Sequence, residues 1–184
     1  MTKSSGTILA GESRPEGRDA RTGPRNLLTA DLVDAHESTL RCCEVQFRQF
    51  GGLARFGGPV RTIKSFEDNT LIKKALSEPG EGAVLVVDGG GSVRCSLLGD
   101  YIAGLGVKNG WSGLVIWGAV RDTVALGKLA LGVKALGANP WRSTKTASGQ
   151  RDVLVAFGGI VIRPNDWLYS DEDGIVVSDR PLSA

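Results

Sequence analysis

Two uninterrupted apolar runs in the middle of the chain most constrain what it can fold into. "AVLVV" spans residues 83–87, and "LVIW" spans residues 114–117. Neither run alternates with polar residues, so each is typical of a strand that is buried on both faces. A helical pattern precedes each run, in residues 68–80 and 99–110. This alternation predicts a mixed α/β domain with parallel crossover units.

The remaining segments predict shorter elements around this centre. A helix begins near Thr29, and apolar residues continue at roughly helical intervals to Cys43. We expect a turn into a strand in 56–66, a short helix or turn in 123–132, and a short strand followed by a loop in 133–141. Residues 152–179 contain three short β runs separated by tight turns. Strands therefore dominate the C-terminal end, where we expect an antiparallel tail.

The bulk composition excludes several classes of function. The chain has 184 residues, 41% of them hydrophobic, which predicts one domain with a sizeable core. The net charge is only +2, and the basic residues do not collect into a stripe, so no nucleic-acid partner is expected. No stretch of about 18 apolar residues occurs, so we expect no membrane span.

Cysteine and histidine usage argues against disulfides and zinc. The chain has three cysteines, an odd number, and two of them are the adjacent Cys42 and Cys43. This pattern favours a reduced compartment, and we expect a cytoplasmic protein. The single histidine, His36, and the lack of a C-x-x-C pair argue against a zinc site. We interpret His36 as a solvated helix residue.

The N-terminal region differs from the rest. Residues 11–25, "GESRPEGRDARTGPR", are rich in Gly, Arg and Pro and nearly free of apolar residues. Such a segment buries too little surface to offset ordering, so we expect residues 1–26 to be a disordered extension and residues 27–184 to form the single domain. The extension lacks the apolar core of a secretory signal, and its acidic residues disfavour a transit peptide.

Three turns lie where a parallel sheet usually binds ligands. "DGGGS" (88–92) and "AVRD" (119–122) follow the two buried strands, and "GDYIA" (99–103) opens the helix between them. If the strands are neighbours, all three turns converge on one crevice at the carboxyl edge of the sheet. The alternative for each turn is structural. "DGGGS" lacks the lysine and spacing of a phosphate loop, and an isolated Asp100 or Arg121-Asp122 is compatible with a solvated turn.

The residue types in these turns suit a small carboxylate and a divalent metal. The first N–H groups of a helix point toward an anion, and Gly99 permits close approach of the backbone. Arg121 offers a planar fork for a carboxylate or keto oxygen. Asp122 is a hard oxygen ligand for Mg²⁺ or Mn²⁺, and such a site needs only one or two carboxylates. Asp100 could bind the metal through water or orient a water molecule.

The G-D-x-x-A turn followed at a distance by R-D resembles the class II aldolases that cleave 4-hydroxy-4-methyl-2-oxoglutarate. These are relatives of RraA, the regulator of ribonuclease activity A. Other segments resemble the RraA branch more closely, in family order: "FGGPVRTIKSFEDN" (56–69), "VLVVDGGGSVR" (84–94), "GLVIWGAVR" (113–121), "FGGIVIRPND" (157–166) and "YSDEDGI" (169–175). The resemblance covers roughly residues 28–182.

The resemblance implies a three-layer β/β/α sandwich of the swivelling-domain type with mixed sheets, assembled as a ring-shaped homotrimer with clefts between subunits. It also implies residue roles. Gly99, Asp100, Tyr101, Ile102 and Arg121 would bind the substrate, Arg121 would polarise it, and Asp122 would hold the metal. In the mechanism that follows, Arg121 and Asp100 are the catalytic residues, with Asp100 holding a water that acts as the base.

Two functions remain open from the sequence. The first is a metal-dependent aldolase that releases pyruvate and also decarboxylates oxaloacetate, because both reactions pass through the same enolate. The second is a regulator that binds a ribonuclease of the E type or an associated helicase. The regulator proper lacks both the G-D turn and the aspartate after the arginine, which favours the enzyme here.

One departure from the aldolase pattern concerns the metal shell. The aldolases carry another acidic residue shortly after R-D, whereas Thr123 to Leu126 follow here. Asp171, Glu172 or Asp173 of a neighbouring subunit is one possible source of that carboxylate. A polar turn is the alternative interpretation of those three residues.

Overall fold

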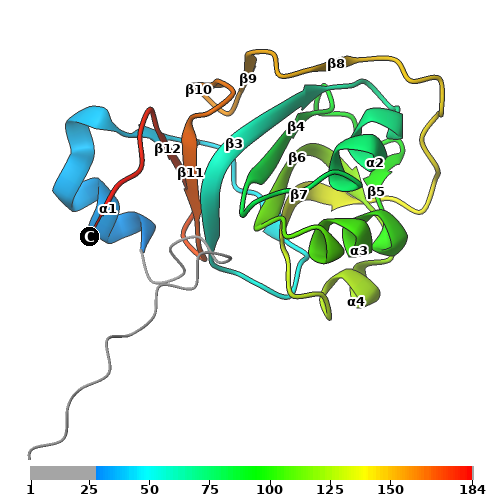
Figure 1. Cartoon of the computed structure of the whole chain (residues 1–184), viewed down its shortest axis with the longest axis horizontal. Helices are drawn as coiled ribbons and strands as arrows, with labels where there is room; N and C mark the ends of the chain where they lie inside the picture. Colours follow the sequence, from blue (N-terminus) through cyan, green and yellow to red (C-terminus); the bar gives the residue numbers. More distant parts are fainter. Residues whose placement is uncertain (1–27, 184) are drawn as a thin grey trace, which may run out of the picture.

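The computed structural model describes residues 28–183, so the expected disordered extension lies outside the described residues (Figure 1). The helices are α1 (Thr29–His36), the 3-10 helix η1 (Glu37–Thr39), α2 (Thr70–Leu76), α3 (Asp100–Lys108) and α4 (Thr123–Leu126). The longer strands are β3 (Phe56–Lys64), β4 (Val84–Asp88), β6 (Gly113–Val120), β7 (Gly132–Ala138), β11 (Trp167–Ser170) and β12 (Ile175–Ser178). The shorter strands are β1 (Arg41–Cys42), β2 (Arg48–Gln49), β5 (Ser96–Leu98), β8 (Gln150–Arg151), β9 (Val155–Phe157) and β10 (Ile160–Ile162).

The two apolar runs form neighbouring strands at the centre of a large mixed sheet. The main path of this sheet is β1-β12-β11-β3-β4-β6-β7-β2, and β3, β4, β6 and β7 are parallel to one another. β11, β12 and β1 continue the sheet with antiparallel pairing, as the C-terminal pattern predicts. The mixed α/β architecture with an antiparallel tail is therefore confirmed.

Alternate residues of the central strands enter two separate cores. Leu85 and Val87 of β4 pack in a core with the helices, whereas Val84 and Val86 pack in a second core with β9, β10 and β11. Figure 1 shows α2, α3 and α4 together on one side of the sheet. Because successive strand residues point to opposite faces, a strand covered on both faces needs this continuous apolar run. The layers are those of a β/β/α sandwich.

Strand β3 joins the parallel and antiparallel parts of the sheet. Its first four residues, Phe56–Pro59, pair with β11, and the rest pair with β4. The Phe56 ring lies against Gly113 and Gly132, which are partners on β6 and β7. A Cβ at Gly132 would lie 2.0 Å from that ring, so only glycine leaves room for it.

The structure differs from the sequence-based prediction at both ends of the domain. The first helix ends at His36, and Arg41 and Cys42 pair with β12 instead of continuing the helix to Cys43. Pairing with a sheet edge satisfies their backbone groups and outweighs the helical spacing. Residues 152–179 contain four strands rather than three, because β9 and β10 are separate arms of a hairpin. The three cysteines are free thiols, and only Cys42 is exposed.

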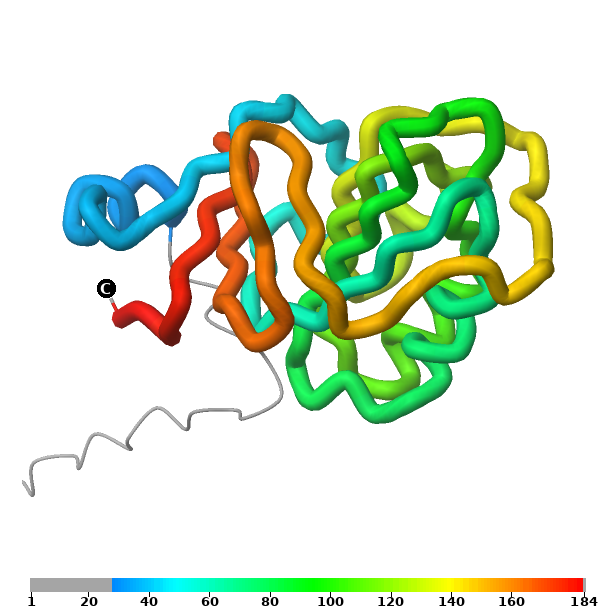
Figure 2. The backbone as a smooth tube through the Cα atoms, turned by 90° about the horizontal axis from the view of Figure 1, so that it is seen from above, coloured from blue at the N-terminus to red at the C-terminus, as the bar shows by residue number. Residues whose placement is uncertain are grey.

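A long segment connects β7 to the β9–β10 hairpin. Figure 2 shows it running around the outside of the domain before the hairpin returns across the sheet. Within residues 28–183, no helix combines the length and apolar character that a bilayer crossing requires.

Candidate functional site

Strand β5 explains why the G-D turn meets the R-D turn. It lies parallel to the end of β6, with Leu98 opposite Val120, and the Arg121 N–H donates a hydrogen bond of 2.9 Å to the Leu98 carbonyl. The segments that follow β5 and β6 therefore leave the sheet at the same edge. Gly99-Asp100 then opens α3, while Arg121-Asp122 leads into α4. The predicted meeting of these two turns is found, although β5 itself was not predicted.

The Asp122 carboxylate lies between the two turns. Its Oδ2 atom is 3.3 Å from Arg121 Nε and accepts a 3.4 Å hydrogen bond from the Asp100 N–H. Asp122 adopts a left-handed backbone conformation, with φ 56° and ψ 39°. This conformation is uncommon for a residue with a side chain, though Asp and Asn tolerate it best. The strained turn directs the carboxylate back toward Gly99 and the start of α3.

The amide groups at the start of α3 already have carboxylate partners. The Asp100 N–H faces Asp122, and the Tyr101 N–H donates a 2.6 Å hydrogen bond to Asp100 Oδ1. These are the groups that we expected a substrate anion to use. A bound carboxylate would therefore compete with Asp100 and Asp122 for the same positive helix end.

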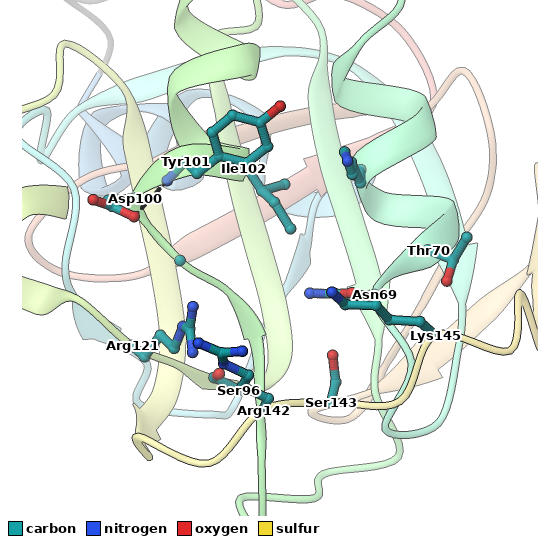
Figure 3. Close-up of a pocket in the computed structure, with 12 residues that line it drawn as sticks. Asn69, Thr70, Ser96, Asp100, Tyr101, Ile102, Arg121, Arg142, Ser143 and Lys145 are labelled. Carbon is teal, nitrogen blue, oxygen red and sulfur yellow. Dashed lines mark hydrogen bonds between the residues drawn. The ribbon is translucent and has the colours of Figure 1, made fainter.

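A pocket of about 460 Å³ lies beside this helix end. Five predicted residues line it: Gly99, Asp100, Tyr101, Ile102 and Arg121. Sequence reasoning missed seven others: Asn69, Thr70, Lys73, Ser96, Arg142, Ser143 and Lys145. Figure 3 shows Arg121 and Arg142 on one side of the pocket, with Asn69 and Lys145 facing them from the other.

Six of the seven missed residues come from two segments to which we assigned no chemistry, and the seventh, Ser96, lies on β5. No role in the predicted site was assigned to Lys73 or Lys145, yet both line the pocket. Asn69 and Thr70 follow β3, which is parallel to β4, so they leave the sheet at the same carboxyl edge as the predicted turns. That strand exit was a signal that the sequence contained. Arg142 and Lys145 carry no comparable local signal.

The charged residues around the pocket are mostly basic. Lys73, Arg121, Arg142 and Lys145 line it, against the single carboxylate of Asp100. Because the cations approach from three different segments, the pocket suits a small molecule with more than one acidic group.

Asp122 lines a neighbouring, smaller cavity of about 260 Å³. Arg121 lines both cavities, and Asn139 and Pro140 also line the smaller one. The side chain of Asp122 is 38% exposed. The predicted metal-binding residue therefore lines the smaller cavity and not the larger pocket, whereas its neighbour Arg121 lines both.

The third predicted turn does not join the site. Loop 88–92 lines neither cavity. The N–H groups of Gly89 and Gly91 donate to the Trp117 carbonyl, and the Gly90 N–H donates to Asp88 Oδ1. The expectation that all three turns share a crevice is wrong for this loop, because its amides already donate to Trp117 of β6 and to Asp88.

The donor set fits a divalent metal that keeps most of its water. Within residues 28–183, no three His, Cys, Asp or Glu side chains gather closely enough to hold a metal. Asp122 and Asp100 nevertheless present two carboxylates at adjoining turns, and Mg²⁺ needs only one or two. A strongly chelating site for zinc would require more ligands than these turns supply.

The turn at residues 171–173 has a structural role in this chain. Asp171 is buried, and its carboxylate accepts hydrogen bonds from Thr29, Asp173 and Gly174. Burial would raise the pKa of Asp171, but these hydrogen bonds outweigh it and lower the pKa. Glu172 is exposed and pairs with Arg55 at 2.9 Å. The geometry of Asp171 supports the interpretation as a polar turn.

Comparison with known proteins identifies the family. The family model described as "RraA-like: Aldolase/RraA" matches residues 29–177. The chain belongs to the RraA-like family. RraA-like relatives include a protein of Alkalilimnicola ehrlichii named "Putative 4-hydroxy-4-methyl-2-oxoglutarate aldolase". It is 58% identical over 84% of this chain and 96% of its own length.

Two solved RraA-like structures match the fold closely but carry different names. The RNA-processing inhibitor RraA of Thermus thermophilis has a TM-score of 0.83 and 43% identity, over 86% of this chain and 96% of that one. A Geobacillus kaustophilus protein named as an S-adenosylmethionine:2-dimethylmenaquinone methyltransferase has a TM-score of 0.82 and 42% identity, over 85% and 97%. Both establish the RraA fold, while the reaction must be argued from the site.

Proposed function

We propose that this protein is a divalent-metal-dependent aldolase that cleaves 4-hydroxy-4-methyl-2-oxoglutarate to pyruvate, with oxaloacetate decarboxylation as a secondary activity. The observation that carries this proposal is the placement of Arg121 and Asp122 against the first residues of α3, beside a pocket with three further cations. The name of the Alkalilimnicola ehrlichii relative agrees with it.

The reaction requires charge stabilisation at one end of the substrate and proton removal at the other. Breaking the C3–C4 bond turns C4 and its hydroxyl into the carbonyl of one pyruvate and leaves the enolate of a second. The Arg121 guanidinium holds the keto oxygen on which that negative charge develops. Asp100, through a water molecule, accepts the proton of the C4 hydroxyl. Protonation of the enolate carbon then gives the second pyruvate.

Asp122 would hold the metal, with Asp100 contributing through water. A bound Mg²⁺ or Mn²⁺ supplies Lewis-acid polarisation of the keto acid. Arg121 Nε lies 3.3 Å from Asp122 Oδ2, so the guanidinium would lie next to that metal position. Lys73 and Lys145 are binding groups in this scheme, and no lysine serves as a Schiff-base nucleophile.

The substrate's two carboxylates account for the excess of cations. One lies near Arg121 and the start of α3. The other reaches the opposite side of the pocket, where Lys145 and Asn69 lie (Figure 3). A monocarboxylate would leave Lys145 without an anionic partner, so we expect dicarboxylates to bind more tightly than monocarboxylates.

The test measures pyruvate release from 4-hydroxy-4-methyl-2-oxoglutarate with Mg²⁺ or Mn²⁺, and with a chelator. We expect metal-dependent turnover in the wild type and its loss in Asp122→Asn. Asparagine tolerates the left-handed conformation, so this variant removes the charge without adding backbone strain. Turnover in the presence of chelator, or full activity in Asp122→Asn, would refute the assignment.

A regulatory function is the second candidate. It is favoured by the 43% identity to the RNA-processing inhibitor of Thermus thermophilis. Under this hypothesis, the protein binds a ribonuclease or an associated helicase. Direct binding to a purified ribonuclease of the E type, retained by Asp122→Ala in a protein without aldolase activity, would favour the regulator.

The homotrimer also belongs to this proposal. A cleft between subunits would bring a second chain close to the exposed side of Asp122 and could complete its ligand set. Native mass spectrometry should give three times the mass of the chain, 19.4 kDa. A monomeric but active protein would show that residues of one chain are sufficient.

A further inference from the structure

The segment Arg142–Thr146, hereafter the basic loop, supplies one wall of the pocket. Arg142, Ser143 and Lys145 all line it. Most of the basic loop is exposed, and it pairs with the rest of the fold only through isolated bridges at Arg142 and Thr144. A loop with so little regular pairing needs another constraint if its cations are to face the pocket.

The carboxylate of Asp68 provides that constraint. Asp68 is fully buried, with 0% of its surface exposed. Its Oδ2 atom accepts hydrogen bonds from Thr144 Oγ1 at 3.1 Å, Thr146 Oγ1 at 2.9 Å and the Thr146 N–H at 2.5 Å. Its Oδ1 atom accepts one from the Thr70 N–H at 2.8 Å, at the start of α2. One side chain therefore ties the basic loop to α2.

The backbone around Asp68 is arranged for the same contacts. Glu67 adopts a left-handed conformation with φ 54°, and its carbonyl accepts hydrogen bonds from the Thr144 N–H and Oγ1. Ser65 Oγ bridges the carbonyls of Asp68 and Ser148. The chain before α2 thus holds the second half of the basic loop, from Thr144, and the residues that follow it.

The Asp68 carboxylate is charged throughout the working pH range. Burial would raise its pKa, but the hydrogen bonds from Thr70 and Thr146 outweigh it and lower the pKa to about 2. An amide at this position would present N–H donors toward groups that are themselves donors. The hydrogen-bond network therefore requires the aspartate at position 68, and an asparagine there would disrupt it.

We infer that Asp68 is a positioning residue, which holds the basic loop against α2 so that Lys145 binds the second carboxylate of a dicarboxylate substrate. Asp68 does not touch the substrate, since it is fully buried and both of its carboxylate oxygens accept hydrogen bonds from the loop or from α2. This inference rests on the proposed function for the identity of the substrate. It adds that the basic loop serves binding, whereas Arg121, Asp100 and Asp122 serve the chemistry.

The test compares Asp68→Asn with a matched control, Asp166→Asn. Asp166 is another buried carboxylate, which accepts hydrogen bonds from Arg41 and Arg163 away from the pocket. For Asp68→Asn we expect KM for oxaloacetate to rise about ten-fold or more, with kcat changed less than about three-fold, because charge-assisted contacts to bound substrate are lost. Asp166→Asn should leave KM unchanged.

Binding measurements separate this inference from the proposed function. Calorimetry uses 2-oxoglutarate, which has a second carboxylate but no hydroxyl to cleave, and pyruvate, which lacks the second carboxylate. Asp68→Asn should weaken 2-oxoglutarate binding about ten-fold and pyruvate binding little. Absence of turnover in the wild type would overturn the proposed function, while this comparison still tests Asp68.

A double variant in the basic loop tests the same contacts in case Asp68→Asn does not fold. Thr144→Val with Thr146→Val removes two hydroxyl donors, keeps the side-chain shape and leaves Asp68 in place. It should reproduce the KM effect, and hydrogen exchange of residues 142–148 should become faster in both variants. Unchanged 2-oxoglutarate binding, unchanged exchange, or an equal KM increase in Asp166→Asn would overturn the inference.

Discussion

Gly99 and Asp122 are in such close contact that a methyl group on Gly99 would collide with the carboxylate. A Cβ at Gly99 would lie 2.6 Å from Asp122 Oδ2 and 3.1 Å from Arg121 Nε. Gly99 has φ −130° and ψ 179°, which any residue adopts, so its backbone conformation does not require glycine. The requirement for glycine comes from the neighbouring carboxylate.

Gly99→Ala should therefore impair the site without unfolding the protein. The added methyl displaces Asp122 Oδ2, and we expect Mg²⁺-dependent activity to fall about ten- to hundred-fold because ligand orientation is lost. Gly104→Ala is the matched control on the same helix, since a Cβ there meets nothing within 4 Å. Activity assays over a Mg²⁺ titration distinguish the two variants. Equal activity of Gly99→Ala and wild type would show that Asp122 is not needed where the structure places it.

Arg121→Lys should lower kcat while the charge is preserved. Lysine presents a point charge, whereas the guanidinium offers a planar fork that bridges both cavities. We expect a loss of about 10²- to 10³-fold in kcat, as for removal of one donor to a developing oxyanion. Arg61→Lys, on the exposed side of β3, serves as the control. A change in KM without a change in kcat would show that Arg121 binds the substrate but does not contribute to catalysis.

Asp68 should make stability sensitive to acid. Its pKa is lowered from 3.8 to about 2 in the folded protein, so its stabilisation is present above pH 3.8 and is lost as the pH falls through about 2. The shift corresponds to about 2 kcal/mol for this buried group. Urea unfolding of wild type and Asp68→Asn at pH 5 and pH 2 tests this. The difference in unfolding free energy should shrink by about that amount at pH 2, and a constant difference would contradict the prediction.

Gly132→Ala should destabilise the fold through Phe56. The new methyl overlaps the Phe56 ring, and overpacking of this kind costs about 1–3 kcal/mol. Phe56→Leu in the same chain should recover part of that loss, because a smaller side chain makes room. Thermal unfolding of the two single variants and the double variant measures this coupling. Additive effects would show that the ring and the glycine do not meet in solution.

The amino-acid pattern alone was sufficient for the central layers. Leu85, Val86 and Ile116 lie in runs whose length and lack of alternation report burial on both faces, and both helices that precede these runs were predicted close to their observed bounds. The pairing of Gly99-Asp100 with Arg121-Asp122 was also predicted. The burial of the strand residues is a local feature, because it leaves its own mark on the spacing of apolar side chains.

Only the tertiary structure decided which other residues complete the site. β5 has three residues, too few to show a period, yet its pairing with β6 brings the two turns together. Arg142 and Lys145 reach the pocket because Asp68, more than 70 residues earlier, holds their loop by hydrogen bonds. Such contacts depend on the direction of a few polar side chains across the fold, and nothing in the local sequence of an irregular loop records them.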